Sequence, residues 1–382
     1  MSVAAEWLRS GEVASLDGID VVILSYPGLP SMPFELKRGQ ASAFVLKDRQ
    51  SRNWILRKFS PGRDPEIAYV RAIRNLVPHE TGFESGSQRR ILTSHAVGRG
   101  FATPEFADWI EKTILMPRVG GESWAGLADL VRDSTITLDE DARATICRSL
   151  ARCVRGLERA GVSHRDLSNT NVFIDPATWN VHFIDWDSLY HPSLILPSNT
   201  TAGSLGYTAP FVMTAKGEDA GESWRPHADR FAMALLCTEF LMLHRGSPFT
   251  HEGGLFEQHD LYARNGPTVR KMQRDLSSRH PAIGRLFERA LQAGTFAACP
   301  SPDEWLAASP LAKQIKSPPL DRQGAMSRFD SYMRKLREPP PPAPPAPALP
   351  VIDFREVIRN TLAPRPPTAP PSGSADAKDT ED

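Results

Sequence analysis

Cysteine is scarce in this sequence, and its few copies are not spaced as metal ligands. The chain has 4 cysteines in 382 residues, and none stands in a Cys-x-x-Cys pair. A zinc site is therefore not expected. Apolar or helical neighbours predict that the cysteines are buried free thiols, which indicates a reducing compartment. They are Cys147, Cys153, Cys237 and Cys299.

Long hydrophobic runs and an excess of one charge are also absent. No apolar run is long enough to span a membrane, and the first residues contain no apolar core like that of a signal peptide. Lys+Arg and Asp+Glu number 45 each, so the formal net charge is zero. We therefore expect a cytoplasmic protein with no membrane insertion and no nucleic acid as its main partner.

Proline is concentrated near the end of the chain and marks a boundary. Residues 338–350 read EPPPPAPPAPALP, a composition that favours polyproline II and cannot pack a core. A short amphipathic segment follows at residues 351–362, and the rest is polar. We expect one folded domain over residues 15–315, then a linker and Pro-rich disordered tail over residues 316–382.

Strand patterns dominate the first half of this domain. Residues 43–48 and 54–59 are short β-like runs that predict a hairpin, and residues 113–119 predict another buried strand. One helix is predicted over residues 65–77, where apolar residues recur at helical spacing.

Helical patterns dominate the second half. They predict helices over residues 138–160, 229–243 and 282–293. A strand-rich part followed by a helix-rich part is an α+β arrangement. We expect two lobes, an N-lobe of about residues 15–116 and a C-lobe of about residues 117–315.

The most specific motif is the segment His164–Asn171, which reads HRDLSNTN. It matches the pattern His-Arg-Asp-Leu-x-x-x-Asn at every specified position. Phosphoryl transfer needs a carboxylate that accepts or orients the attacking hydroxyl, a role for Asp166, and Asn171 can turn back and hold a metal ion. A polar surface loop is the alternative, and the motifs that follow make it the weaker one.

A second motif, VHFIDWDS at residues 181–188, ends an apolar run with acidic residues. It includes Asp185, which would bind a Mg²⁺ ion that bridges the nucleotide phosphates. The segment resembles the Asp-Phe-Gly segment of kinases, with Trp186 at the aromatic position and Asp187 in place of the glycine. A lone Asp-x-Asp is more often a turn, but the order of the two motifs favours the metal role.

Together these motifs resemble those of bacterial Ser/Thr protein kinases of the eukaryotic-like type, over about residues 39–305. TAGSLGYTAP at residues 201–210 resembles the end of an activation segment. Residues 227–232 resemble the start of the long buried helix whose aspartate, here Asp229, anchors the catalytic loop. Small-molecule kinases of the aminoglycoside and choline kinase type lack the activation-segment element.

The resemblance implies a two-lobed protein-kinase-like fold and an ATP- and Mg²⁺-dependent transfer of phosphate to Ser or Thr hydroxyls of a protein. One ion pair of the family is missing, because its two positions hold Phe211 and Cys299. A lone buried charge would be costly, so the joint loss indicates an apolar replacement in an intact domain.

The nucleotide-binding half resembles the family less closely. Gly39 is the one glycine in a segment that resembles a Gly-rich loop. The strand at residues 54–59 should supply the cation that grips the nucleotide phosphates, and Arg57 and Lys58 are the candidates. Only one can face the site, because neighbouring strand residues point to opposite faces. Lys58 is preferred, since arginine is a poor isosteric substitute, although a surface role for this lysine is nearly as well supported.

The acidic partner of this cation and the contacts to adenine follow from the resemblance. Glu66, at the start of the predicted helix, is preferred over Glu84, which lies in a Gly/Ser-rich predicted loop. The backbones of Met116 and Arg118 would contact the adenine, and Arg118 is the expected amide donor because the proline between them has no N–H.

The activation segment would span residues 185–210 and contains several hydroxyl residues. Arg165 could clamp a phosphate placed on one of them, and ordinary solvated loop residues are an equal alternative. The candidates are Ser193, Ser198, Thr200, Thr201 and Ser204.

Two other functions stay open. A pseudokinase scaffold is favoured by the degraded Gly-rich segment and opposed by the intact acidic residues. A small-molecule kinase is favoured by Asp187. The expected partners are a protein substrate, a cognate phosphatase and a Pro-motif-binding protein that recognises the tail.

Overall fold

The computed structural model describes residues 2–309, apart from residues 39–40, 63–64, 198–201, 215–216, 219, 246, 248–253 and 265. The described residues all belong to one compact unit, Met1–Arg322. The predicted linker and tail lie outside the described residues. So do Gly39 and three hydroxyl residues of the predicted activation segment, Ser198, Thr200 and Thr201.

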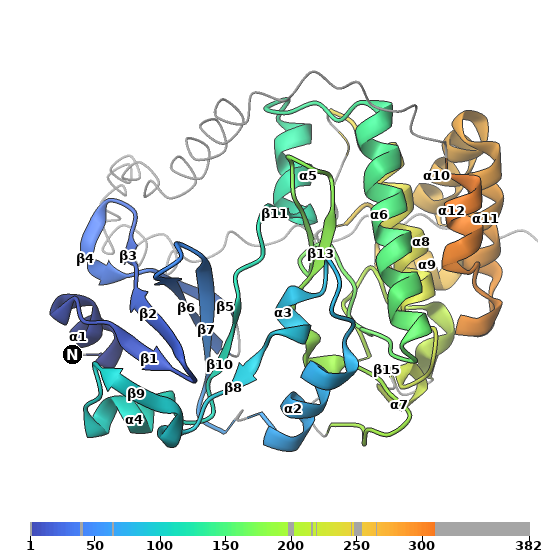
Figure 1. Cartoon of the computed structure of the whole chain (residues 1–382). Coiled ribbons are helices and arrows are strands. Elements are labelled where there is room, and N and C mark those ends of the chain that lie inside the picture. The colour runs from blue at the N-terminus through green and yellow to red at the C-terminus, as the bar shows by residue number, and fades with distance from the viewer. Residues whose placement is uncertain are drawn as a thin grey trace, which may run out of the picture. The chain divides into compact units, whose positions relative to one another are not determined.

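An antiparallel sheet forms most of the N-terminal part (Figure 1). Its strands run in the order β8-β10-β7-β6-β2-β1-β9, with β5 paired to β6. The predicted hairpin is confirmed as β6 and β7, which pair Val45 with Ile55, and the predicted strand at residues 113–119 is β10. The strands are β1 (Ala14–Leu16), β2 (Ile19–Ile23), β5 (Glu35–Arg38), β6 (Ala41–Asp48), β7 (Asn53–Phe59), β8 (Arg90–Ile91), β9 (Val97–Gly100) and β10 (Ile114–Pro117).

Two short helices pack against this sheet in a shared apolar core. The indole of Trp7, in α1 (Val3–Ser10), is buried against Phe106 of α4 (Pro104–Ile110). Its Nε1 donates to the carbonyl of Glu12 at 2.9 Å, so the buried N–H has a partner. The compact unit thus includes a packed helix ahead of residue 15, where the sequence placed the start of the domain.

Helices form the C-terminal part around a second core. The three predicted helices are confirmed as α6, α8 and α11, and α8 is buried along nearly its whole length because it is apolar on almost every face. The helices of this part are α5 (Trp124–Arg132), α6 (Glu140–Arg159), α7 (Ala220–Ser223), α8 (Asp229–Met242), α9 (Gln258–Ala263), α10 (Pro267–Arg279), α11 (Pro281–Gln292) and α12 (Pro302–Ala308).

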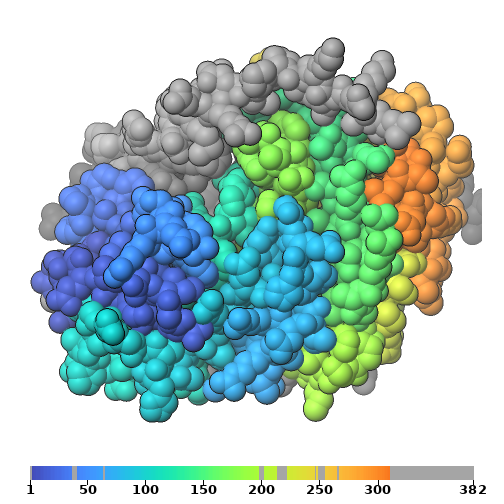
Figure 2. Space-filling view, in the orientation of Figure 1, coloured from blue at the N-terminus to red at the C-terminus, as the bar shows by residue number. Residues whose placement is uncertain are grey.

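Two further helices lie between the sheet and α6. The helix predicted at residues 65–77 is confirmed as α2 (Ile67–Leu76). The predicted loop around Glu84 is wrong, because it forms the one-turn helix α3 (Glu84–Ser87). Small residues permit this close packing, since a Cβ atom at Gly86 would lie 2.8 Å from the ring of Trp186. Figure 2 shows the light-blue residues of α2 and α3 on the face next to the green residues of α6.

A small sheet carries both sequence motifs. It consists of β11 (Glu122–Ser123), β12 (Val172–Ile174) and β13 (Val181–Phe183). β12 begins directly after Asn171, and β13 ends two residues before Asp185. Because β12 and β13 pair antiparallel, the start of one lies beside the end of the other, and the two motifs meet there.

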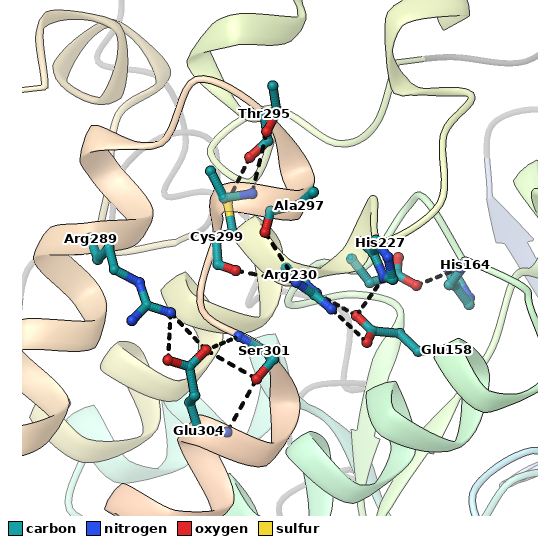
Figure 3. Close-up of polar contacts among 12 residues, drawn as sticks. Glu158, His164, His227, Arg230, Arg289, Thr295, Ala297, Cys299, Ser301 and Glu304 are labelled. Atoms are coloured by element: carbon teal, nitrogen blue, oxygen red, sulfur yellow. Dashed lines mark hydrogen bonds and ion pairs between the residues drawn. The ribbon is translucent and has the colours of Figure 1, made fainter.

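Phe211 and Cys299, at which the sequence predicts an apolar replacement of a missing ion pair, both lie in apolar surroundings. The rings of Phe211 and Phe296 meet edge-on with centroids 4.8 Å apart, and Cys299 is buried and free, like the other three cysteines. A different ion pair lies beside it, where Arg230 of α8 binds Glu158 of α6 at 2.6 Å and also donates to the carbonyl of Cys299 (Figure 3). Arg230 therefore connects α6, α8 and the segment that leads into α12.

Candidate phosphotransfer site

The loop after α6 is held by an aspartate at the start of α8. The two carboxylate oxygens of Asp229 accept the backbone N–H groups of His164 and Arg165, at 2.7 Å each. Burial raises the pKa of Asp229 to about 7, while the two backbone donors favour its ionised form. These bonds hold Arg165 at a φ of 70°, a left-handed conformation that is costly for arginine. The anchoring role that the resemblance implied for Asp229 is confirmed.

Asp166 lies in this loop and is contacted from two sides. Its Oδ2 accepts from Nδ2 of Asn171 at 3.1 Å, and its Oδ1 accepts the hydroxyl of Ser204 at 2.6 Å. Burial raises the pKa of Asp166 to about 6, and the nearby charge of Asp185 adds to the rise, whereas the two hydrogen bonds oppose it. Such a carboxylate changes protonation near neutral pH, which suits a general base.

Asp185 is aligned with the catalytic loop through backbone contacts. The N–H of Ile184 donates to the carbonyl of Asn171 at 3.0 Å, and Nε2 of His164 lies 2.9 Å from the carbonyl of Ile184. Burial lowers the pKa of His164 to about 4, so this ring is neutral at physiological pH. The structure therefore brings Asp166, Asn171 and Asp185 together, although they come from two separate segments.

The aromatic residue after Asp185 fastens this segment to α3. The indole of Trp186 is buried, and its Nε1 donates to the hydroxyl of Ser85 at 2.9 Å. Its ring also lies against His164, with centroids 4.7 Å apart, and against Phe83 at 6.0 Å. Trp186 thus couples the position of Asp185 to both α3 and the catalytic loop.

Arg57 of β7 faces the acidic residues that follow β13. Its Nη1 lies 2.8 Å from Oδ1 of Asp185 and 2.6 Å from Oδ2 of Asp187. Lys58 points elsewhere, and its Nζ donates to the carbonyl of Glu111 at 3.3 Å. The preference for Lys58 as the residue that faces the site is therefore wrong, because the alternation along the strand gives that face to Arg57.

Neither predicted glutamate pairs with this cation. Glu66 is exposed where α2 begins, and Glu84 pairs with His182 at 3.1 Å. The carboxylates that contact Arg57 come instead from the segment after β13. The preference for Glu66 is wrong, because its side chain lies in solvent ahead of the helix.

The predicted adenine contacts lie on and just after β10. The N–H of Arg118, expected to donate to the base, donates to the carbonyl of Asn53 at 3.0 Å. That prediction is wrong, because pairing with β7 continues past the proline and uses this donor. Met116 is half-buried and pairs with Ile55 in the same ladder.

The guanidinium of Arg165 is engaged by its own chain. Nε donates to the carbonyl of Ser223 and Nη1 to that of Ser188, both at 2.9 Å, and the ring of Trp224 lies 4.8 Å from the guanidinium carbon. The side chain is buried as well. A phosphate clamp at Arg165 would have to break these contacts. Ser193, one candidate acceptor, hydrogen-bonds His191.

Two contacts of the site had no clear sequence signal. Arg89, which follows α3, is 1% exposed, and its Nη2 lies 3.0 Å from Oδ1 of Asp187. No sequence motif includes Arg89. Its one link to the site in the sequence is that it follows the segment that packs on Trp186. Ser204 was a candidate phosphate acceptor, but its bond to Asp166 depends on how the chain returns to the catalytic loop.

The fold and these loops define a protein-kinase-like protein with two lobes, and the predicted α+β fold class is confirmed. The family model described as the protein kinase domain matches residues 106–287. This match begins in α4 and so covers the catalytic loop and the segment after β13, but not the strands that precede α4. A comparison with curated proteins gives no match. Within the described residues, no helix is long and apolar enough to cross a membrane.

Proposed function

We propose that the protein is an ATP- and Mg²⁺-dependent protein kinase that phosphorylates Ser or Thr hydroxyls in bacterial signalling. The observation that carries this proposal is the convergence of Asp166, Asn171 and Asp185. Asp166 orients and deprotonates the attacking hydroxyl, and its pKa of about 6 makes the carboxylate the main form at pH 7. Phosphoryl transfer otherwise needs positioning and charge stabilisation more than covalent chemistry.

Asn171 and Asp185 are the residues that would hold the metal ion, which would neutralise charge on the phosphates. Nδ2 of Asn171 donates to both the carbonyl and the side chain of Asp166, so the amide oxygen is the atom left for a cation. Oxygen ligands from one carboxylate and one amide suit Mg²⁺, which keeps waters and substrate phosphates as its other ligands.

The cation that grips the nucleotide phosphates is Arg57 in this proposal. Its side chain is 18% exposed, and one of its two terminal nitrogens, Nη1, makes the ion pairs with Asp185 and Asp187. A planar guanidinium can bind phosphate oxygens through two nitrogens, whereas an ammonium acts as a point charge. The substrate is a protein, the compartment is the cytoplasm, and a cognate phosphatase and a tail-binding protein are the expected partners.

A pseudokinase scaffold is the second candidate, and one observation favours it. Arg57 occupies an oxygen of Asp185 that a metal ion would use. If this ion pair persists in the presence of Mg²⁺ and ATP, the site stays closed to the metal and the fold serves as a binding surface.

The deciding experiment uses the purified full chain with Mg²⁺ and γ-labelled ATP, alone and with a Ser/Thr-rich protein as acceptor. We expect labelled protein from the wild type and none from Asp166→Asn, with unchanged circular dichroism. Phosphoamino acid analysis identifies the acceptor residue. Thermal-shift titration with Mg-ATP separates the alternatives, because a scaffold that binds no nucleotide gives neither label nor shift.

A further inference from the structure

Asp187 is held between two arginines from different elements. Its Oδ2 accepts from Nη1 of Arg57 at 2.6 Å, and its Oδ1 accepts from Nη2 of Arg89 at 3.0 Å. Of these two arginines, it is Arg57 that contacts Asp185, two residues earlier. The two acidic residues of the motif therefore have different surroundings.

We propose that Asp187 is the positioning residue that holds Arg57 for the nucleotide phosphates, and that Arg89 fixes Asp187. This rests on the proposed kinase activity. In this arrangement, the carboxylate that holds the cation belongs to Asp187, two residues after the candidate metal ligand. A glutamate of α2 or α3 does not supply it. The acidic partner of the phosphate-binding cation has thus moved to the segment that also carries Asp185.

Burial makes this arrangement specific. Arg89 is almost completely enclosed, and its Nε and Nη1 have no hydrogen-bond partner among the described residues. A buried guanidinium needs a compensating charge, and Asp187 is the carboxylate that contacts it. One carboxylate oxygen of Asp187 is therefore tied to Arg89, while the other oxygen binds Arg57.

The same arrangement separates the tasks of the two aspartates. Because Asp187 also binds Arg57, the arginine stays in place if Asp185 is used as a metal ligand. Asp187 has both oxygens engaged by arginines, so it is the poorer candidate for a metal ligand. Asp187 contacts a single nitrogen of Arg57. The remaining N–H groups of the guanidinium can therefore donate to phosphate oxygens.

The first test needs no activity. Thermal unfolding of Arg57→Met, Asp187→Asn and the double variant forms a double-mutant cycle. We expect the double variant to lose clearly less melting temperature than the two single losses added together. Additive losses would show that the two residues do not act as a pair and would overturn the proposal.

The second test measures rates while Mg²⁺ is titrated. We expect Asp187→Asn to lower kcat roughly tenfold to a hundredfold, because the cation is no longer positioned, with little change in the Mg²⁺ concentration for half-maximal rate. Asp187→Glu should recover part of kcat. Asp185→Asn should instead raise the Mg²⁺ requirement. If Asp187→Asn raises it equally, Asp187 is a metal ligand and the proposal fails.

A matched control is Asp48→Asn, since Asp48 is also a buried carboxylate paired with an arginine, Arg52 at 2.7 Å. It should lower the melting temperature and leave kcat unchanged. If the wild type neither binds nor turns over Mg-ATP, the proposed activity fails on its own. A coupled cycle in that case still supports Asp187 as the residue that holds Arg57.

Discussion

At the residue scale, Arg57 and not its neighbour Lys58 is the cation of β7 that faces the acidic residues of the site. Arg57 and Lys58 are neighbours of the same charge, and the sequence offers no way to choose between them except by analogy. The structure places Arg57 against Asp185 and Asp187, whereas Lys58 reaches the carbonyl of Glu111. The choice follows from strand alternation combined with the register of β7 in the sheet.

The first prediction is a strongly asymmetric pair of variants. Arg57→Met should lower the rate roughly a hundredfold or more, because it removes the cation that is proposed to stabilise phosphate charge. Lys58→Met should keep nearly the full rate, since its nitrogen contacts a carbonyl away from the acidic residues. Initial rates at saturating Mg-ATP measure both. Full wild-type rates for both variants would show that neither cation acts in catalysis.

The second prediction concerns pH. The base must be ionised, and the pKa of Asp166 is raised to about 6, so kcat/KM should fall as the pH drops through about 6 and level off above it. Ser204→Ala removes a hydroxyl that stabilises the ionised form. The acidic limb should therefore move to higher pH in that variant. A profile of kcat/KM from pH 5 to 8, recorded for the wild type and for Ser204→Ala, checks this. An acidic limb at the same pH in both would show that Ser204 does not influence the titration of Asp166.

At the element scale, α3 shows how packing overrides a sequence that predicts a loop. Its Gly and Ser residues have modest helix propensity, but they allow Trp186 to approach closely. Ser85 then supplies the acceptor for the indole N–H. The helix thereby fixes the segment that carries Asp185 and Asp187. No local sequence pattern indicates this contact.

The third prediction tests this contact with Gly86→Ala. The added methyl would lie 2.8 Å from the indole of Trp186, so overpacking should cost about 1–3 kcal/mol of unfolding free energy and lower the rate as well. Gly294→Ala is the matched control, because no atom lies within 4 Å of its added Cβ. Urea unfolding and initial rates measure the pair. A fully stable and active Gly86→Ala protein would show that α3 tolerates displacement of the indole.

At the scale of the whole molecule, the two lobes differ in how far they resemble the family. The family match starts at residue 106, and the departures in the N-lobe include an arginine in place of the expected lysine and an acidic partner from another segment. The C-lobe keeps the aspartate that anchors the catalytic loop. We interpret the N-lobe as the part of the molecule that departs further from the family pattern.

The fourth prediction concerns the end of the chain. Deletion of residues 338–382 should leave the melting temperature and the catalytic rate almost unchanged, because a polyproline-rich sequence buries little surface. Differential scanning fluorimetry compares the melting temperatures of the truncated and full-length proteins, and initial-rate measurements compare their catalytic rates. A clear loss of thermal stability would instead indicate that residues 351–362 pack on the kinase-like unit.

The sequence by itself determined the fold class and the loops that carry the chemistry. The segment His164–Asn171 and Asp185 could be recognised because the chemistry of phosphoryl transfer fixes residue types at short, regular spacings. The hairpin of β6 and β7 and the long helices could be predicted for a similar reason, since the period of the apolar residues is local information.

Only the tertiary structure decided which charges meet. Arg57, Arg89 and Asp187 come from β7, the end of α3 and the segment after β13, and their contacts depend on how three elements pack. The predictions for Lys58, Glu66 and Arg118 were wrong for the same reason. Side-chain direction, strand register and the use of a backbone N–H are set by partners distant in sequence, and no local pattern records them.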